Sequence, residues 1–304
     1  MAEIVYVDRI TRNLERETVY GAMFINLLYG TGGLSRFLSL LVLPLIARIS
    51  FFSKLYGFLQ KSPLSRWKVK PFIRKFEVDT SEFLDPVDSF ASFNDFFIRK
   101  LKKQARPFAA GEDVAIMPAD ARYLVYQNIA AADGFLVKGK KFDLGQLLQN
   151  DTLKKRYENG TMVIARLCPT DYHRFHFPCD AIPGHPHLIN GPLYSVNPAA
   201  LKKNISILAE NKRILTSLET GHFGTIIYID VGATYVGSIH QVFTPGKQYK
   251  KGDEKGYFSF GGSSLILLFE PDRIRLDQDL IDASLGKMEM KGLLGQSLGR
   301  ALSK

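Results

Sequence analysis

From about residue 110 onward the chain consists of short apolar runs separated by Gly, Pro, Asn and Asp, and this pattern is what most constrains its fold. Runs of about four to eight apolar residues between turn residues are typical of β-strands. The runs expected to form strands are Arg122–Gln127, Met162–Leu167, Arg213–Leu218, Thr225–Asp230, Tyr235–Val242, Tyr257–Phe260 and Leu265–Phe269. Few helices are expected among them, and Asp143–Gln149 is one. The sequence therefore predicts a β-rich core.

The first hundred residues have a different pattern, which favours helices. We expect one helix over Thr11–Tyr29, a second over Leu34–Leu59 that breaks near Pro44, and a short one over Ser92–Leu101 with Ser92 as its N-cap. The expected fold class is α+β: a helical, basic region over residues 1–90, followed by a β-rich domain over residues 91–304.

The helical region is also depleted in acidic residues. Between Thr18 and Phe76 there is no Asp or Glu, while nine Lys and Arg residues alternate with aromatic residues. The apolar run Phe37–Ala47 would span about 16 Å as a helix, which is too short for a hydrocarbon core of about 30 Å. We therefore expect this region to lie on an anionic membrane surface rather than cross the bilayer. The alternative is an ordinary core-facing helix, because apolar residues recur at helical spacing at Leu38, Leu41, Val42 and Leu45.

The overall charge fits such a surface. The chain has 40 basic and 30 acidic residues, a formal net charge of +10, which indicates anionic partners. We expect no nucleic-acid partner, because no recognised nucleic-acid module accompanies the charge. Two cysteines exclude a disulfide scaffold and fit a reducing compartment. Residues 1–17 contain four acidic residues, so we do not expect a signal peptide there.

Common nucleotide and metalloprotease motifs are absent, and three local features remain as candidate sites. The first is Asp120, which ends an apolar run just before an expected strand. Its carboxylate could orient a catalytic base, although Asp is also a common turn residue.

The second feature is the pair His173 and His176 in the aromatic segment 171–179. Neutral imidazole near pH 7 is the natural proton-transfer group, and a structural role for both histidines is the alternative. Cys168 and Cys179 flank them and could complete a two-His, two-Cys zinc site. The spacing is too tight for the usual paired knuckles, so we expect no metal.

The third feature is Gly261-Gly262-Ser263-Ser264, between two expected strands. By default two glycines here form a hairpin turn. A Gly-Ser pair is also what backbone self-cleavage needs, because Gly262 leaves its carbonyl open to attack by the Ser263 hydroxyl. A nearby Asp–His pair would remove the hydroxyl proton.

Taken together, these residues resemble the phosphatidylserine decarboxylase family from about residue 90 to the end of the chain. Seven motifs stand in the family's order, which is far more specific than any one of them. They are FNDFFIRKLK (93–102) followed by Arg106-Pro107, PAD (118–120), KGKKFDLGQLL (138–148), DYHRFHFPCD (171–180), YSVNP (194–198), VGATYVGSI (231–239) and GGSS (261–264). The tail GLLGQSLGRA (292–301) also fits, whereas Ala121 stands where the family usually has Gly.

The resemblance implies a role for each candidate residue. Asp120 would orient His176, and His176 would deprotonate Ser263. Ser263 would attack the Gly262 carbonyl and cleave the chain between 262 and 263, which leaves a β chain and a small α chain headed by a pyruvoyl cofactor made from Ser263. His173 would donate a proton in the decarboxylation.

The implied reaction converts phosphatidylserine to phosphatidylethanolamine through a Schiff base between the pyruvoyl group and the substrate amine. The resemblance also implies a peripheral enzyme on the cytoplasmic side of the inner membrane, and it allows a homodimer. Two alternatives stay open at this point. One is a pyruvoyl-dependent decarboxylase of a soluble amino acid, and the other is a membrane-bound homologue that does not mature.

Overall fold

The computed structural model describes residues 4–18, 20, 57–130, 143–201, 204–233, 239–260 and 263–302. The expected helix over Leu34–Leu59 falls almost entirely outside these residues, as do Gly261 and Gly262.

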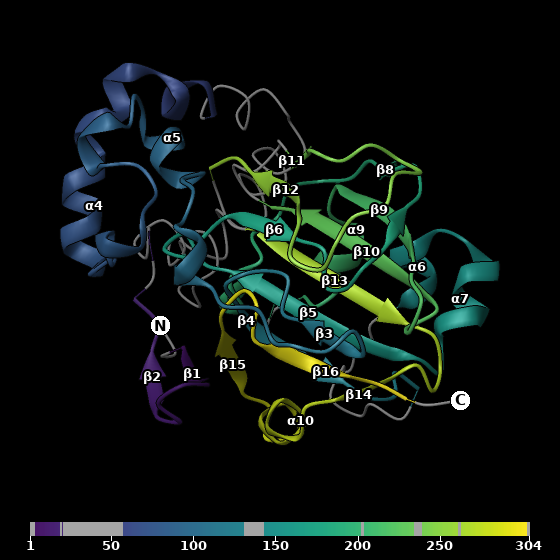
Figure 1. Ribbon diagram of the computed structural model, residues 1–304. Coiled ribbons are helices and arrows are strands. Elements are labelled where there is room, and N and C mark those ends of the chain that lie inside the picture. Colours follow the sequence, from purple (N-terminus) through teal and green to yellow (C-terminus); the bar gives the residue numbers. More distant parts are fainter. Residues whose placement is uncertain are drawn as a thin grey trace, which may run out of the picture.

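Most of the described chain is built around one large sheet (Figure 1). Its strands are β1 (Val5–Asp8), β2 (Leu14–Arg16), β4 (Ala121–Tyr126), β5 (Thr161–Leu167), β7 (Ile182–Pro183), β8 (His187–Ile189), β9 (Arg213–Glu219), β10 (Thr225–Gly232), β13 (Ser263–Phe269) and β15 (Glu289–Gly292). These ten strands are ordered β2-β1-β15-β4-β5-β13-β10-β9-β7, and β8 also pairs with β9. The long central strands β5, β13 and β10 are antiparallel neighbours.

Two small sheets accompany the large one. One has the order β11-β12-β6 and the other β14-β16-β3. Their strands are β3 (Val114–Ile116), β6 (Arg174–His176), β11 (Ile239–Gln241), β12 (Glu254–Phe258), β14 (Ile274–Leu276) and β16 (Ser297–Ala301). Both sheets contribute buried side chains to one core, together with alternate residues of the central strands.

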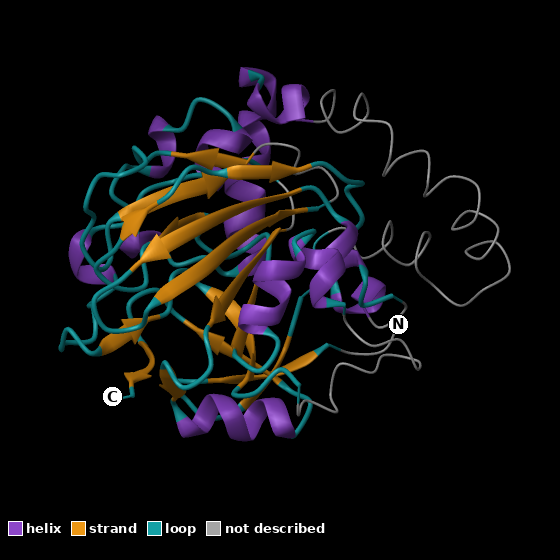
Figure 2. Ribbon diagram, turned by 90° about the vertical axis from the view of Figure 1, so that its right-hand side faces the viewer, coloured by secondary structure: helices purple, strands orange, loops and turns teal. Residues whose placement is uncertain are grey.

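The helices are short. They are α4 (Val69–Phe76), α5 (Phe93–Phe97), α6 (Leu144–Leu148), α7 (Asp151–Tyr157), α8 (Pro198–Leu201), α9 (Ile207–Glu210) and α10 (Gln278–Leu285), with 3-10 turns η1 (Pro63–Lys68), η2 (Thr80–Glu82), η3 (Val87–Ser89) and η4 (Lys103–Ala105). α6, α8 and α9 pack on the other face of the large sheet and enclose a second core. Figure 2 shows the central strands as a twisted fan between these layers.

The strand predictions for the β-rich part are largely confirmed. β4, β5, β9, β10 and β13 coincide with expected runs to within two residues at each end. The central strands read as continuous apolar runs because both of their faces are buried, one in each core. Helix α6 also lies where it was expected, and the Asp143 side chain caps it by accepting from the backbone N–H of Gly145 at 2.8 Å.

The hairpin reading of the Gly261–Ser264 segment is wrong. β12 pairs with β11 and β6, whereas β13 pairs with β5 and β10, so the two flanking strands belong to different sheets. The chain therefore passes from one sheet to another immediately before Ser263. A local sequence pattern of two strands and two glycines could not reveal this change of sheet.

The expected helix over Thr11–Tyr29 is wrong at its beginning. β1 and β2 form an antiparallel hairpin, and β1 continues the large sheet by pairing in parallel with β15. The Asp8 carboxylate accepts the backbone N–H groups of Ile10 and Thr11, and Arg12 adopts φ 61° in the turn. Pairing with β15, which follows β1 by 283 positions in the sequence, outweighs the weak local helical pattern.

A third cluster of buried residues lies on both sides of the expected boundary at residue 90. Six phenylalanines pack with Val69 around α4 and α5, and Phe260 joins them from the β-rich part. Ser92 caps α5 as expected and accepts from the backbone N–H of Asp95, although the helix ends at Phe97 instead of Leu101. Among the described residues, no helix combines the length and apolarity needed to cross a bilayer.

Candidate active site

Ser263 is the first residue of β13, in the middle of the large sheet. It lies opposite Gly232 of β10 and Leu167 of β5. The side chain is fully buried, and its Oγ has no hydrogen-bond partner among the described residues. A buried hydroxyl without a partner costs about 1–3 kcal/mol, which is tolerated where function requires it.

The alternation of β13 separates the two serines. Leu265, Leu267 and Phe269 lie in the core shared with the small sheets, so Ser263 belongs to that face. Ile266 and Leu268 lie in the opposite core, and Ser264 shares their face. The Ser263 hydroxyl therefore faces the core shared with the small sheets, and the Ser264 hydroxyl faces the core under the helices.

The other predicted residues gather at the same end of the sheet as Ser263. Asp120 immediately precedes β4, and Arg122 of β4 lies opposite Arg166 of β5, which in turn lies opposite Ser264. The loop that carries His173 leaves the end of β5 directly after Leu167. Three adjacent strands thus bring together residues that are about 140 positions apart in sequence.

Asp120 is buried and held by a bidentate ion pair. Arg106 donates from Nε to Oδ1 at 2.9 Å and from Nη2 to Oδ2 at 2.7 Å. The backbone N–H of Leu294 donates to Oδ1 at 2.8 Å. The far side of the Arg106 guanidinium is bound in the same way by the Glu82 carboxylate, at 2.7 and 2.9 Å.

His176 ends β6 and is buried, with its ring stacked against Tyr172. Its Nδ1 lies 2.9 Å from the Gly252 carbonyl oxygen. A carbonyl can only accept, so Nδ1 carries the proton, and Nε2 is left as a buried acceptor with no partner among the described residues. Burial lowers the pKa of His176 below its usual value, and the Gly252 carbonyl and the charges of Glu254 and Asp120 offset this only in part. A neutral imidazole with a free Nε2 is suited to remove a proton.

The expected orientation of His176 by Asp120 does not take the form of a hydrogen bond in this structure. Within the described part of the chain, the carboxylate is engaged by Arg106 and Leu294, and the imidazole Nδ1 by Gly252. Asp120 acts on His176 through its charge, while the backbone N–H of His176 donates to the Pro118 carbonyl at 2.9 Å and ties the two segments together.

His173 is fully buried and has different neighbours from His176. Its Nδ1 donates to the Asp171 carbonyl at 3.0 Å. The ring of Phe97, at the end of α5, lies on it with centroids 3.8 Å apart. Phe97 also contacts Phe260, which precedes the glycines of the proposed cleavage site, so α5 links His173 to that segment.

A buried charge network anchors the loop before His173. Arg122 donates to both carboxylate oxygens of Asp171 at 2.6 Å, and Arg166 pairs with Glu17 at 2.7 Å. The Cys168 thiol lies 3.1 Å from the Glu17 carboxylate, and burial raises its pKa well above the usual value. Cys168 therefore belongs to this network, as a protonated thiol.

Sequence reasoning gave no role to three buried residues at this site: Arg99, Arg106 and Asp171. Arg106 and Asp171 lay within motifs quoted for the family resemblance, and so did Arg99 in FNDFFIRKLK. The signal that the sequence offered was a charged residue within a strongly aromatic segment. Such a segment is expected to be buried, and a charged side chain is seldom buried without a specific partner.

Ala121, the departure from the family's usual Gly, is accommodated without strain. It is the first residue of β4, does not have a positive φ, and its methyl group lies in the core shared with the small sheets. It pairs with Gly292, where an added Cβ would lie 2.2 Å from the Met117 sulfur. At this pair of residues the core has room for the methyl group of Ala121 on β4, but not for a side chain at Gly292 on β15.

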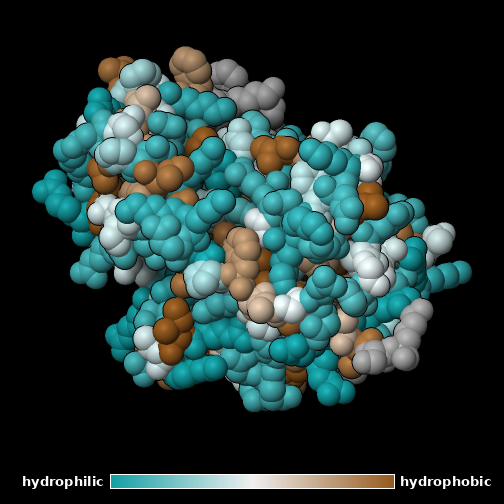
Figure 3. Space-filling model, in the orientation of Figure 1, coloured by the Kyte–Doolittle hydropathy of each residue, from teal (hydrophilic) through white to brown (hydrophobic). Residues whose placement is uncertain are grey.

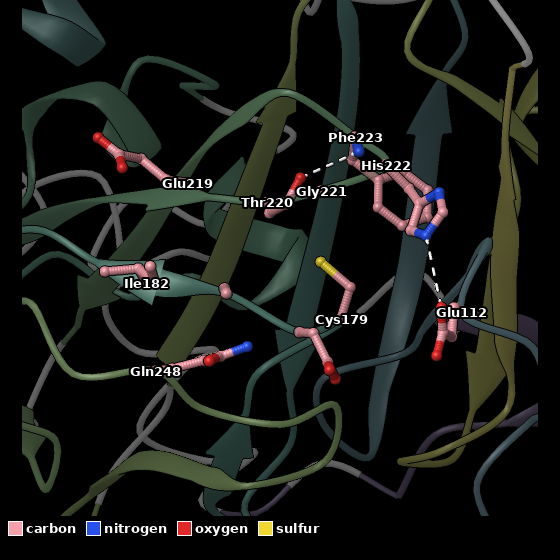
Figure 4. Close-up of a pocket in the computed structure, with 11 residues that line it drawn as sticks. Glu112, Cys179, Ile182, Glu219, Thr220, Gly221, His222, Phe223 and Gln248 are labelled. Atoms are coloured by element: carbon pink, nitrogen blue, oxygen red, sulfur yellow. Dashed lines mark hydrogen bonds and ion pairs between the residues drawn. The ribbon is translucent and has the colours of Figure 1, made fainter.

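A separate cavity of about 400 Å³ lies away from these residues. It is lined by Cys179, Glu219 and the turn before β10, and Nε2 of His222 lies 3.9 Å from the Glu112 carboxylate at its rim (Figure 4). This turn precedes the first residue of β10, whereas Ser263 lies opposite the last. None of the four predicted catalytic side chains lines the cavity.

Comparison with known proteins agrees with the site. The model of the phosphatidylserine decarboxylase family matches residues 93–299. Proteins named phosphatidylserine decarboxylase proenzyme are similar over nearly the whole length. The protein from Chlamydia pneumoniae is 47% identical over 97% of both chains, that from Chlamydia caviae 46% over 99% of both, and that from Chlamydia felis 44% over 100% of both. The chain belongs to the phosphatidylserine decarboxylase family.

Proposed function

We propose that this chain is a proenzyme that cleaves itself at Ser263 and then decarboxylates phosphatidylserine to phosphatidylethanolamine. Family membership supports the reaction. The observation that carries the self-cleavage is the position of Ser263: a buried hydroxyl with no partner among the described residues, at the point where the chain enters the central strand after two glycines.

In the first step the Ser263 Oγ attacks the carbonyl carbon of Gly262, and Nε2 of His176 takes the hydroxyl proton. The amide becomes an ester in this N-to-O shift. Elimination then releases residue 262 as the carboxylate end of the β chain and leaves dehydroalanine at position 263. Water replaces the nitrogen of dehydroalanine, ammonia leaves, and the α chain begins with a pyruvoyl group.

The surroundings of position 263 fit a pyruvoyl group. The side chain at 263 lies on the core face of a central strand, where water is excluded, and His173 is held at the same end of the sheet. A pyruvoyl ketone supplies the electron sink that an amino-acid decarboxylation requires. We assign His173 as the group that donates a proton to the substrate carbon after CO₂ leaves.

We further propose that the enzyme works as a peripheral protein on an anionic membrane surface, on the cytoplasmic side of an inner membrane. Four large apolar side chains between residues 58 and 67 are exposed: Phe58, Leu59, Leu64 and Trp67, with exposed fractions of 70, 52, 85 and 72%. Lys61 and Arg66 lie among them in the sequence, and Lys68 follows directly. Figure 3 shows apolar surface over this helical part of the molecule, at the upper left. Apolar residues with a basic rim are typical of surfaces that enter the headgroup region.

The decisive experiment combines the mass of the purified protein with a lipid assay. We expect two fragments, the smaller starting at position 263 with a blocked N-terminus, and release of CO₂ from phosphatidylserine vesicles. Ser263→Ala should remain a single inactive chain, whereas Ser264→Ala, whose hydroxyl faces the opposite core, should still be cleaved. An unbroken wild-type chain would indicate a homologue that does not mature, and activity on free serine would indicate a soluble substrate.

A further inference from the structure

Arg99 differs from the other buried arginines at this site. It lies two residues after α5, with 5% of its surface exposed. Arg106, Arg122 and Arg166 each form an ion pair with a buried carboxylate. Among the ion pairs of the described residues, none involves Arg99.

The Arg99 guanidinium instead binds the backbone of the turn before His173. Its Nη2 donates to the carbonyl oxygens of Thr170 at 3.2 Å and of Asp171 at 3.4 Å. Its carbon Cζ lies 5.0 Å from the ring centres of both Phe83 and Phe96, so aromatic side chains pack on the cation. The same Asp171 carbonyl oxygen also accepts the hydrogen bond from Nδ1 of His173.

The buried Arg99 guanidinium lowers the stability of the fold, so stability does not explain why an arginine is present here. Burial lowers the pKa of Arg99 to about 10, so the side chain is still a cation near neutral pH. Its Nε and Nη1 have no acceptor among the described residues. A buried cation without a carboxylate and with unused donors loses more hydration energy than its few contacts return, and an apolar side chain would fill the space at lower cost. Such local conflicts are expected where a residue is kept for function.

We propose that Arg99 is a positioning residue for His173. It fixes the Thr170–Asp171 turn so that the Asp171 carbonyl meets Nδ1 of the imidazole, while Phe97 from the same segment fixes the plane of the ring. With one proton held on Nδ1, Nε2 is the nitrogen that takes up a second proton from water and gives it to the substrate carbon, which returns the ring to the Nδ1–H form. The inference rests on the proposed role of His173 in decarboxylation, but its direct consequence, the tautomer of His173, is a property of the protein by itself.

The test compares Arg99→Met, Arg99→Lys and a matched control, Arg213→Met. Arg213 is also a buried arginine without an ion pair in the described chain, and it holds the backbone carbonyls of Gln146, Leu147 and Asn211 on the helical side of the sheet. Both Met variants remove a buried guanidinium that binds carbonyl groups, but only one of them is next to His173.

Long-range ¹H–¹⁵N spectra of protein labelled at its six histidines report which ring nitrogen carries the proton, and His173→Gln identifies the His173 signal. We expect the Nδ1–H form in the wild type and in Arg213→Met, and a mixture of tautomers in Arg99→Met. In the mature enzyme, kcat of Arg99→Met should fall about 10- to 100-fold with KM changed less than about threefold, and Arg99→Lys should recover part of kcat because it retains a donor. Self-cleavage should proceed in all of these variants.

The proposal fails if Arg99→Met keeps the Nδ1–H form and loses no more kcat than Arg213→Met. It also fails if self-cleavage and kcat fall together, since this indicates general damage to the fold. If Arg99→Met does not fold, Arg99→Lys decides, because its ammonium cannot reproduce the planar contact of the guanidinium. The proposal is then contradicted if Arg99→Lys has the wild-type tautomer of His173 and full kcat. If the wild type neither cleaves itself nor releases CO₂, the proposed function is wrong, while the tautomer comparison still decides the role of Arg99.

Discussion

Arg106 binds both carboxylate oxygens of Asp120, with Nε 2.9 Å from Oδ1 and Nη2 2.7 Å from Oδ2, and both side chains are more than 90% buried. The pair connects the segment after the helical region to the start of β4. It holds the Asp120 carboxylate beside the candidate active site, and the carboxylate acts on His176 through its charge, without a hydrogen bond.

Replacing Arg106 with Met should therefore damage both stability and maturation. It leaves Asp120 and Glu82 close together without their shared cation, and breaking a buried pair in this way costs about 3–5 kcal/mol. We expect a lower midpoint of urea unfolding and self-cleavage slowed at least about tenfold. Arg300→Met, which removes an exposed ion pair with Asp113, is the control and should change neither. Normal cleavage in Arg106→Met would show that maturation does not need the ion pair between Arg106 and Asp120.

The rate of self-cleavage should depend on pH through His176. The imidazole must be neutral to accept the Ser263 proton, and burial holds the pKa of His176 below its usual value of about 6.5. The rate should thus be constant from about pH 8 to 7 and fall about tenfold per unit only at pH values below the lowered pKa. Pulse–chase of newly synthesised chain at a series of pH values measures this. A rate that already falls between pH 8 and 7 would contradict the assignment, and His176→Ala should not cleave at any pH.

His173 and His176 should be separable by mutation because they have different neighbours and different proposed roles. His173→Ala should be cleaved into two fragments and yet turn over about 10²- to 10⁴-fold more slowly, the usual range for loss of a positioned acid. Gel analysis of fragments and CO₂ release from the same preparation give both values. Full turnover by His173→Ala would remove its role as proton donor.

Membrane binding should depend on the exposed apolar residues of the helical region. Leu64→Ser removes a side chain that is 85% exposed, and Leu285→Ser removes one that is 76% exposed on α10. We expect Leu64→Ser to lower partitioning onto vesicles of phosphatidylglycerol and phosphatidylcholine by about 5- to 10-fold, as one buried leucine allows, and Leu285→Ser to have no effect. Vesicle sedimentation measures both, and binding should weaken as salt is raised. Equal effects of the two substitutions would place the docking surface elsewhere.

A buried ion pair in the core should be replaceable as a pair but not singly. Lys255 and Asp230 are fully buried, 2.9 Å apart, and Gln241 contacts both. Burial lowers the pKa of Lys255 and raises that of Asp230. Lys255→Met alone should cost about 3–5 kcal/mol, because it leaves a buried carboxylate without a cation.

The double variant Lys255→Met, Asp230→Asn should recover most of that loss, because no charge is then left buried. Urea unfolding in the Ser263→Ala background compares single chains in every case. A double variant as unstable as the single one would mean that packing of the lysine stem, and not its charge, is what stabilises this region.

The strands of the central sheet could be predicted from sequence because their signal is local. β5, β10 and β13 are buried on both faces, so most of their residues are apolar and the runs end where turn residues begin. The motif around Ser263 was equally visible, because self-cleavage needs a small residue directly before a hydroxyl. Strand β1 could not be predicted in the same way, since it is short and is stabilised by pairing with β15 at the other end of the chain.

The sequence by itself determined the β-rich core, the Gly-Ser pair and the identity of the candidate acids and bases. Only the tertiary structure decided that the chain changes sheets before Ser263, that Arg106 and not His176 binds the Asp120 carboxylate, and that Arg99 holds the turn that orients His173. The physical reason is range. Apolar periodicity and turn chemistry act between neighbours in the chain, whereas hydrogen bonds and ion pairs form between whichever groups the packing of the sheets brings within about 3 Å.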